Sequence, residues 1–138
     1  MQNLEKLNQT LTEFYDKMSS WEQSVVKETG YSLAQTHTIE VLGSHGALRM
    51  KELAEKLGIT TGTLTVQVEK LVKAGLIVRR PHSEDRRAIV VELTEAGQAI
   101  HQQHNQLHLE LVKDLTRNIS PEQAEVLLQC LGEMNREF

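Results

Sequence analysis

The sequence predicts a mainly α-helical protein with one small β-hairpin. Over most of the chain, apolar residues recur every three or four positions, the spacing of amphipathic helices. The period changes in LIVRR and RAIVVEL, two runs rich in β-branched residues on either side of the polar turn PHSEDR. Residues 48–92 also hold nine Lys and Arg against six Asp and Glu, a net charge of +3, whereas the remaining residues hold six against thirteen, a net charge of −7. This basic centre either favours a polyanionic partner or is a chance fluctuation.

The composition excludes several classes of protein. The 138 residues suffice for one domain with accessory helices. No apolar run approaches the length of about 18 residues that predicts a transmembrane helix. The start, MQNLEKLNQT, lacks the basic and apolar regions of a secretory signal. The single cysteine, Cys130, excludes an intrachain disulfide and a cysteine-cluster zinc finger. We therefore expect a cytoplasmic protein without a membrane partner.

Long helices are predicted on both sides of the basic centre. In the first, apolar residues from Leu4 to Val25 form one stripe, and Gly30 ends the helix. Ser120 followed by Pro121 predicts a helix start, because serine caps the helix and proline suits its first position. The predicted outer helices cover residues 3–27, 32–42, 95–118 and 121–136.

The centre of the chain predicts a helix-turn-helix. MKELAEKLG predicts a short helix ended by Gly58, and TTGTLTVQVEKLVKAG predicts a second helix ended by Gly75. Two helices joined by a three-residue turn have the pattern of a helix-turn-helix, and the basic hairpin that follows makes it a winged helix. We expect a winged helix-turn-helix domain over residues 31–94. An N-terminal dimerisation helix over residues 1–30 and C-terminal dimerisation helices over residues 95–138 lie on either side of it in the sequence.

The second helix of this pattern is predicted to enter the major groove of double-stranded DNA. Its threonine hydroxyls and lysine suit phosphates, threonine methyl groups can touch thymine methyls, and glutamine can bind adenine. The alternative is that some of the threonines only cap the helix. The candidate contacts on this helix are Thr60, Thr61, Thr63, Thr65, Gln67 and Lys70.

The hairpin predicts a second contact with DNA. Its arginines suit a narrow minor groove, where negative potential is concentrated, or the flanking phosphates. An acidic residue opposes that role, so we interpret Asp85 as a brace for a neighbouring arginine; a solvated charge cluster is the alternative. The candidate residues of the hairpin are Arg80, Asp85, Arg86 and Arg87.

The apolar stripes on the first helix and the last two predict a second copy of the chain. The central domain is too small to cover three extra helices, and each buried leucine contributes roughly 1.5–3 kcal/mol. A twofold contact between identical helices is the simplest way to cover them, and it presents two recognition helices to one duplex. The alternative is a monomer whose terminal helices fold back on its own domain.

Several histidines are candidate metal ligands. His104 and His108 lie one helical turn apart, so both imidazoles face the same way and can share one tetrahedral Zn²⁺. His37, from another helix, and a carboxylate would complete the site. In the alternative without metal, these histidines bond each other, backbone carbonyls or water.

Two other function classes have less support. The sequence contains no GxSxG, HExxH, P-loop or GxGxxG motif, so we expect no enzyme. A winged helix that binds only protein is the alternative to a DNA-binding domain, and the basic centre and arginine-rich hairpin argue against it.

The centre of the chain resembles the MarR family of bacterial winged-helix regulators. The resemblance extends over the helix-turn-helix, Gly75-Leu76, Asp85-Arg86-Arg87, and Leu93-Thr94 followed by Gly97, and the flanking helices fit the family's dimerisation region. It implies a homodimer on a palindromic operator, usually a repressor, whose DNA binding an effector changes. It also implies that Asp85 braces the wing and that Arg87 reaches the minor groove.

Two branches of the family are similar in more detail. The segment from His37 to Gly43, the GTLT sequence of the recognition helix, and the histidines at 101, 104 and 108 resemble the FabT branch, which controls fatty-acid synthesis. That resemblance implies an acyl chain on acyl carrier protein as the effector. His37, His104 and His108 also align with the metal site of the zinc-sensing AdcR and ZitR branch. There the first helix supplies a glutamate, which implies Glu22 as the fourth Zn²⁺ ligand.

Overall fold

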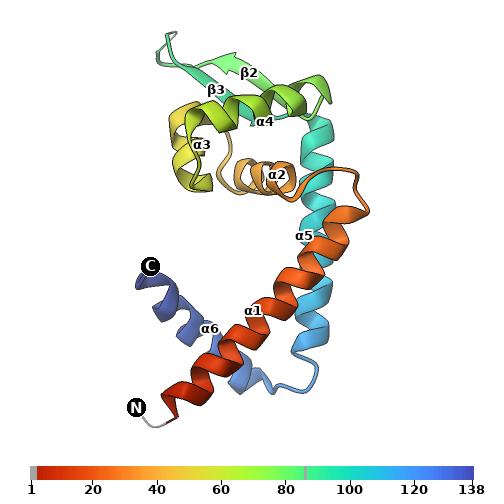
Figure 1. Ribbon diagram of the computed structural model, residues 1–138, viewed down its shortest axis with the longest axis vertical. Helices are drawn as coiled ribbons and strands as arrows, with labels where there is room; N and C mark the ends of the chain where they lie inside the picture. The colour runs from red at the N-terminus through yellow and green to blue at the C-terminus, as the bar shows by residue number, and fades with distance from the viewer. Residues whose placement is uncertain (1–2, 86) are drawn as a thin grey trace. The chain divides into compact units, whose positions relative to one another are not determined.

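The computed structural model describes residues 3–85 and 87–138, in which six helices accompany a small three-stranded antiparallel sheet (Figure 1). The predicted fold class is confirmed. The helices are α1 (Leu4–Lys27), α2 (Leu33–His45), α3 (Met50–Leu57), α4 (Thr61–Lys73), α5 (Glu95–Leu115) and α6 (Pro121–Arg136). The strands are β1 (Leu48–Arg49), β2 (Ile77–Pro81) and β3 (Ile89–Leu93).

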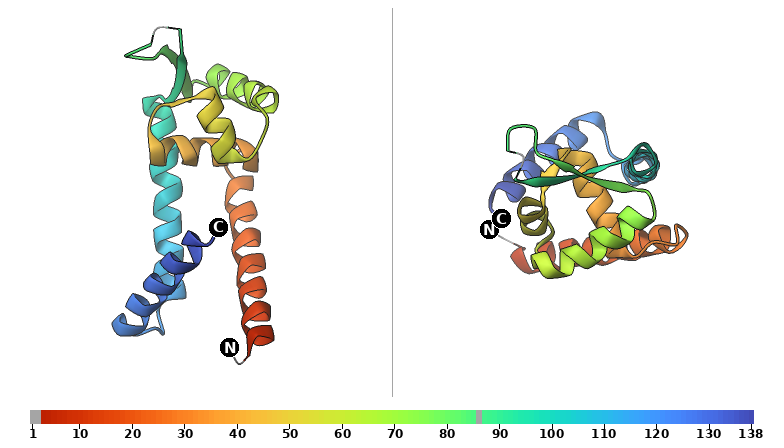
Figure 2. Two further views of the ribbon diagram at one scale, coloured as in Figure 1. Left: turned by 90° about the vertical axis from the view of Figure 1, so that its left-hand side faces the viewer. Right: turned by 90° about the horizontal axis from the view of Figure 1, so that it is seen from above.

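The chain divides into two compact units, one ending at Ala99 and the other beginning at Ile100. Within the first unit, α2, α3, α4 and the sheet enclose one apolar core. We call these elements together, residues 33–93, the winged body. The β2–β3 hairpin projects from its helices (Figure 2). The core side chains that are less than 2% exposed include Ile39, Leu42, Leu53, Leu64, Val68, Leu71, Ile77 and Val91.

β3 is the central strand of the sheet, which has the order β1-β3-β2. β2 and β3 form the predicted hairpin, with Ile77 opposite Leu93. The two-residue strand β1 was not predicted, because a segment this short shows no alternation of apolar and polar residues. It pairs Leu48 with Val91, so the loop before α3 is held against the centre of the sheet.

The helix starts follow from local hydrogen bonds. Ser32 and Gln35 form a reciprocal capping box at the start of α2, and Ser120 and Gln123 form another at the start of α6, where Ser120 is the predicted cap. The Thr60 hydroxyl oxygen accepts a hydrogen bond from the Thr63 backbone N–H at 3.2 Å, so Thr60 caps α4. Each cap satisfies an N–H group that has no partner within its helix.

Two predicted helix ends were wrong by about one turn. Gly43 does not close α2, which continues to His45; Gly46 ends it with a φ of 78°, a conformation that glycine adopts without strain. α5 ends at Leu115 instead of near residue 118. After this point, from Arg117 until α6 begins, the backbone hydrogen bonds span three residues instead of four. The Arg117 N–H, for example, donates to the Asp114 carbonyl at 3.3 Å.

The second unit contains most of α5 and all of α6, joined by residues 116–120. α6 has no buried residue. Its large apolar side chains are 42–65% exposed, and they are Val126, Leu127, Leu128, Leu131 and Met134. Among the described residues, no helix combines the length and the hydropathy that crossing a membrane requires.

Candidate nucleic-acid interface

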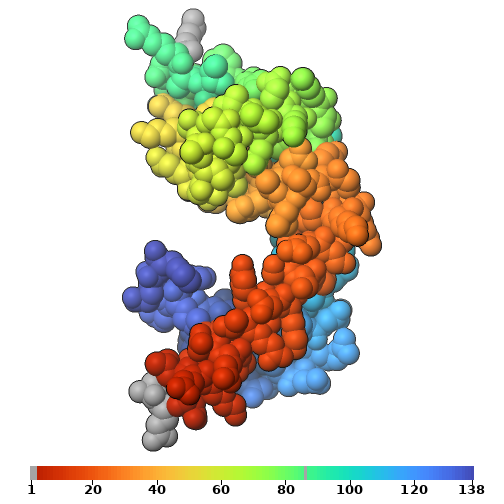
Figure 3. Space-filling model, viewed as in Figure 1, coloured from red at the N-terminus to blue at the C-terminus, as the bar shows by residue number. Residues whose placement is uncertain are grey.

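α4, the second helix of the helix-turn-helix, has one face in the core and the opposite face at the surface of the winged body. Leu64, Val68 and Leu71 are fully buried. The residues on the other side are exposed, and Figure 3 shows that the segment of α3 and α4, coloured yellow to green, lies at the surface. The winged body therefore fixes the orientation of α4 and leaves its outer face open to a partner.

The four predicted threonine contacts differ in what their hydroxyl protons can do. A hydroxyl has a single proton, and a phosphate oxygen can only accept one. Thr60 donates to the Thr63 hydroxyl at 3.0 Å, and Thr65 donates to the Thr61 carbonyl at 2.8 Å. The protons of Thr61 and Thr63 have no such acceptor among the described residues. Thr61 and Thr63 are therefore the better phosphate donors of the four, whereas Thr60 is the helix cap.

Gln67 is turned partly toward the interior of the winged body. It is half-buried, and its Oε1 lies 3.3 Å from the Thr38 hydroxyl of α2, whose single proton is shared with the closer Ala34 carbonyl at 2.9 Å. Thr38 itself is fully buried. A bidentate contact with adenine needs both the amide oxygen and the amide nitrogen. In this conformation the amide oxygen lies beside the buried Thr38, so the predicted contact requires the side chain to rotate.

Lys70 is exposed on α4, as expected for a residue that meets a phosphate. Sequence reasoning missed three other residues of the outer face, because it identified α4 residues by hydroxyl, amide or charge chemistry rather than by their position around the helix. Gly62, Val66 and Glu69 are exposed and follow one another at spacings of four and three. That helical spacing is the signal that could have identified them.

Two hairpin arginines are held by carboxylates. Arg79 binds Glu69 of α4 through an Nη2–Oε2 contact of 2.8 Å, and Arg80 forms an ion pair with Glu92 of β3. The hydrogen bond from Arg79, and then its charge, hold the pKa of the Glu69 carboxyl below its usual value. The Arg79–Glu69 pair joins the base of the hairpin to the outer part of α4.

The hairpin tip is organised by Asp85 and His82. The Asp85 Oδ1 accepts a hydrogen bond from the Arg87 backbone N–H at 3.0 Å, a brace on the backbone rather than on the guanidinium. His82 Nδ1 accepts from the N–H groups of Glu84 and Asp85 at 3.1 and 3.3 Å. Arg87 is exposed, and no carboxylate of the described residues pairs with it. Arg86, the other predicted contact, lies outside the described residues.

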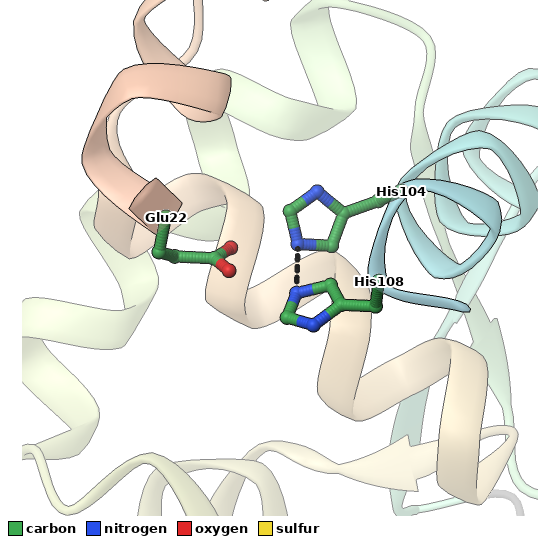
Figure 4. Close-up of side chains that lie close together, drawn as sticks. All are labelled: Glu22, His104 and His108. Atoms are coloured by element: carbon green, nitrogen blue, oxygen red, sulfur yellow. Dashed lines mark hydrogen bonds between the residues drawn. The ribbon is translucent and has the colours of Figure 1, made fainter. Parts of the chain in front are cut away.

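The two histidines of α5 bond each other. His104 is buried, His108 is half-buried, and their Nε2 atoms lie 3.1 Å apart (Figure 4). At this distance one Nε2 carries a proton and the other accepts it. Both Nε2 atoms point to one place, as a shared metal ion requires, and Zn²⁺ would replace the shared proton.

The other two predicted metal ligands belong to the first unit. His37 is exposed on α2, and Glu22, which is also drawn in Figure 4, is half-buried on α1. Their part in a metal site stays a prediction.

Comparison with known proteins gives consistent matches. The family model described as "MarR family" matches residues 31–89. The uncharacterized HTH-type transcriptional regulator YfiV of Bacillus subtilis is 32% identical over 106 residues, which cover 76% of this chain and 66% of that protein. The HTH-type transcriptional repressor YetL of the same organism is 32% identical over 83 residues, 60% of this chain and 50% of that protein. The matched part of the chain thus spans about two thirds of the length of YfiV and half of the length of YetL.

A solved structure is similar over nearly the whole chain. It is FabT of Streptococcus pneumoniae in complex with DNA, with a TM-score of 0.83 and 25% sequence identity. The similarity covers 96% of this chain and 94% of that one.

Proposed function

Because the chain belongs to the MarR family of transcriptional regulators, whose members are not enzymes, we propose that it is a repressor that binds a palindromic DNA operator as a homodimer. The observation that carries the proposal is the open outer face of α4 on the same rigid core as a hairpin that presents the exposed Arg87. A helix of this kind fits the major groove, and an exposed arginine next to it fits a minor groove or a phosphate.

The homodimer is supported by apolar side chains that each unit leaves at its surface. On α1, Leu4, Leu7, Leu11 and Phe14 are 40–62% exposed, and α6 has exposed apolar residues along its length. Such continuous apolar surface marks a protein–protein contact, and identical chains form such contacts with twofold symmetry. Two winged bodies related by a twofold axis match the two halves of a palindrome.

The proposal also includes an effector, a metal ion or a small ligand, that changes DNA binding. The facing Nε2 atoms of His104 and His108 support Zn²⁺, with His37 and Glu22 as the further ligands that the family resemblance implies. An acyl chain or acyl carrier protein as effector rests on the resemblance to the FabT branch alone. Either effector acts only if it binds one spacing of the two winged bodies more tightly than another.

A mobility-shift titration at two salt concentrations tests DNA binding. A protein that contacts several phosphates releases counterions, so its affinity falls by roughly a thousandfold between about 50 and about 200 mM salt. We expect a fall of this kind. Absent binding to every duplex, or binding that salt does not change, would instead favour a winged helix that binds protein.

The Arg87→Ala variant is expected to bind a selected duplex about tenfold more weakly and to keep its thermal unfolding temperature, because this exposed side chain supports DNA contact but little packing. Mobility shift and thermal unfolding measure the two effects. Lys17→Ala is the matched control, since it removes one exposed positive charge from α1. Equal affinity of the Arg87 variant and the wild type would remove the hairpin tip from the interface.

Purification without chelator is expected to leave zinc bound to the wild type and to remove it from the His104→Ala/His108→Ala variant, because the two imidazoles are adjacent ligands. Metal analysis of both proteins gives zinc per chain. His45→Ala, which changes an exposed histidine of α2, is the control and is expected to keep the metal. Near-zero zinc in all three proteins would exclude a resident zinc ion and leave a metal-free histidine pair.

A further inference from the structure

The outermost line of α4 is formed by Gly62, Val66, Glu69 and Lys73. Their spacings of four, three and four residues put them on one stripe of the helix, directly opposite the buried Leu64. The three predicted threonines within the helix, which follow the N-cap, stand on either side of this stripe. In a helix that lies in the major groove, the outermost stripe faces the base edges and the flanks face the two phosphate backbones.

Val66 is the apolar residue of this stripe. Its side chain is 57% exposed, whereas its α4 neighbours Leu64 and Val68 are fully buried. An exposed valine on a helix contributes little to the fold, and valine is a weaker helix former than alanine. Its isopropyl group is therefore available to a partner that presents an apolar group at the same place.

Gly62 lies one turn before Val66 on the same stripe. Its φ is not positive, and a Cβ added there would meet only the Thr60 hydroxyl, at an ordinary 3.9 Å. Neither the backbone nor the interior requires glycine, although glycine within a helix costs about 1 kcal/mol relative to alanine. The absent side chain leaves space on the outside of the helix, where a duplex would approach.

We propose that Val66 recognises a thymine by packing its isopropyl group on the thymine C5-methyl, and that Gly62 provides the close approach this contact needs. The C5-methyl is the apolar group that a base pair presents in the major groove. The inference rests on the proposed function, since it names the base that the DNA-binding face reads.

Uracil substitution tests the contact, because deoxyuridine lacks the C5-methyl and keeps the pairing edge of thymine. Duplexes that bind the wild type are first selected from a random-sequence library. In the tightest of them, each thymine is then replaced singly by deoxyuridine. Dissociation constants are measured for the wild type, Val66→Ala, Gly62→Ala, and the control Leu33→Ala, which truncates an exposed aliphatic side chain on α2.

We expect one thymine in each half-site at which uracil weakens wild-type binding by about fourfold, the value of one buried methyl or methylene group. Val66→Ala is expected to bind the thymine and uracil duplexes equally at that position, and Leu33→Ala to keep the fourfold difference. Gly62→Ala is expected to bind more weakly than the wild type although its thermal unfolding temperature is equal or higher.

The outcomes separate the inference from the proposed function. If the library yields no duplex that binds the wild type, DNA binding and the inference both fail. If the wild type binds but tolerates uracil at every position, or if Val66→Ala keeps the wild-type sensitivity, the thymine contact is wrong and DNA binding stands. Unchanged affinity of Gly62→Ala would overturn the role of Gly62.

Discussion

The Gly97→Ala variant is expected to lose about 3 kcal/mol of unfolding free energy, a large part of the stability of a small domain. Gly97 is buried at the start of α5, where its N–H donates to the Thr94 hydroxyl at 3.2 Å. A Cβ there would lie 2.2 Å from the Leu76 carbonyl oxygen and 3.2 Å from the Leu93 Cβ. These neighbours are backbone and near-backbone atoms, so no rotation of a side chain relieves the clash.

The clash would also disturb the junction that holds the hairpin to the rest of the winged body. The Leu76 carbonyl accepts the Thr94 N–H at 3.0 Å, and the Thr94 hydroxyl donates to the Gly75 carbonyl at 2.6 Å. Urea denaturation measures the loss. Gly62→Ala is the matched control, since its Cβ would meet only the Thr60 hydroxyl, at an ordinary 3.9 Å, and the change should leave stability equal or raise it by up to about 1 kcal/mol. Equal stability of Gly97→Ala and the wild type would contradict the close approach.

The Leu127→Asp/Leu131→Asp variant is expected to be monomeric and to bind a selected duplex on the order of a hundredfold more weakly. Both leucines are 43% exposed on α6, which has no buried residue, so neither belongs to the chain's own buried core. In the proposed dimer they would place buried carboxylates between the two copies, which is strongly unfavourable. The affinity falls because the two half-sites are then bound independently.

Size-exclusion chromatography with light scattering measures the mass, and mobility shift measures the affinity. Gln129→Asp is the control, because it adds one carboxylate to the opposite side of α6 and should keep both dimer and affinity. A double variant that stays dimeric would show that α6 is not the contact. A monomeric variant with wild-type affinity would show that a single chain suffices for DNA binding.

The arrangement of helices could be predicted because each helix carries its own signals in the sequence. The Ser120 and Gln123 capping box and the apolar spacing of α4 are local features, and the structure has both. The motif Leu93-Thr94 followed by Gly97 could be recognised in the sequence, but the physical reason why it needs glycine could not. The Leu76 carbonyl that excludes a side chain at Gly97 comes from a segment about twenty residues away in the sequence.

The candidate interface was predicted less completely, because a residue type does not reveal which way its side chain faces. Gln67 matches an adenine contact by its chemistry, yet its partner is Thr38, 29 positions earlier in the chain. Val66 has no distinctive chemistry, and only its helical spacing from Leu64 and Val68, which the structure buries, could have shown that it faces outward. Long-range packing, which periodicity alone does not specify, decided the position of Gln67.

Glu69 places a carboxylate in the middle of a surface that is otherwise suited to a polyanion, where it pairs with Arg79 and stays exposed. Repulsion from phosphates applies to every duplex, whatever its sequence. In the proposed repressor, the penalty would therefore shorten the time the protein spends on random chromosomal sites, while favourable base contacts would compensate for it at the operator. Because a genome offers millions of competing non-specific sites, weak non-specific DNA binding increases the fraction of protein molecules that are free to reach the operator.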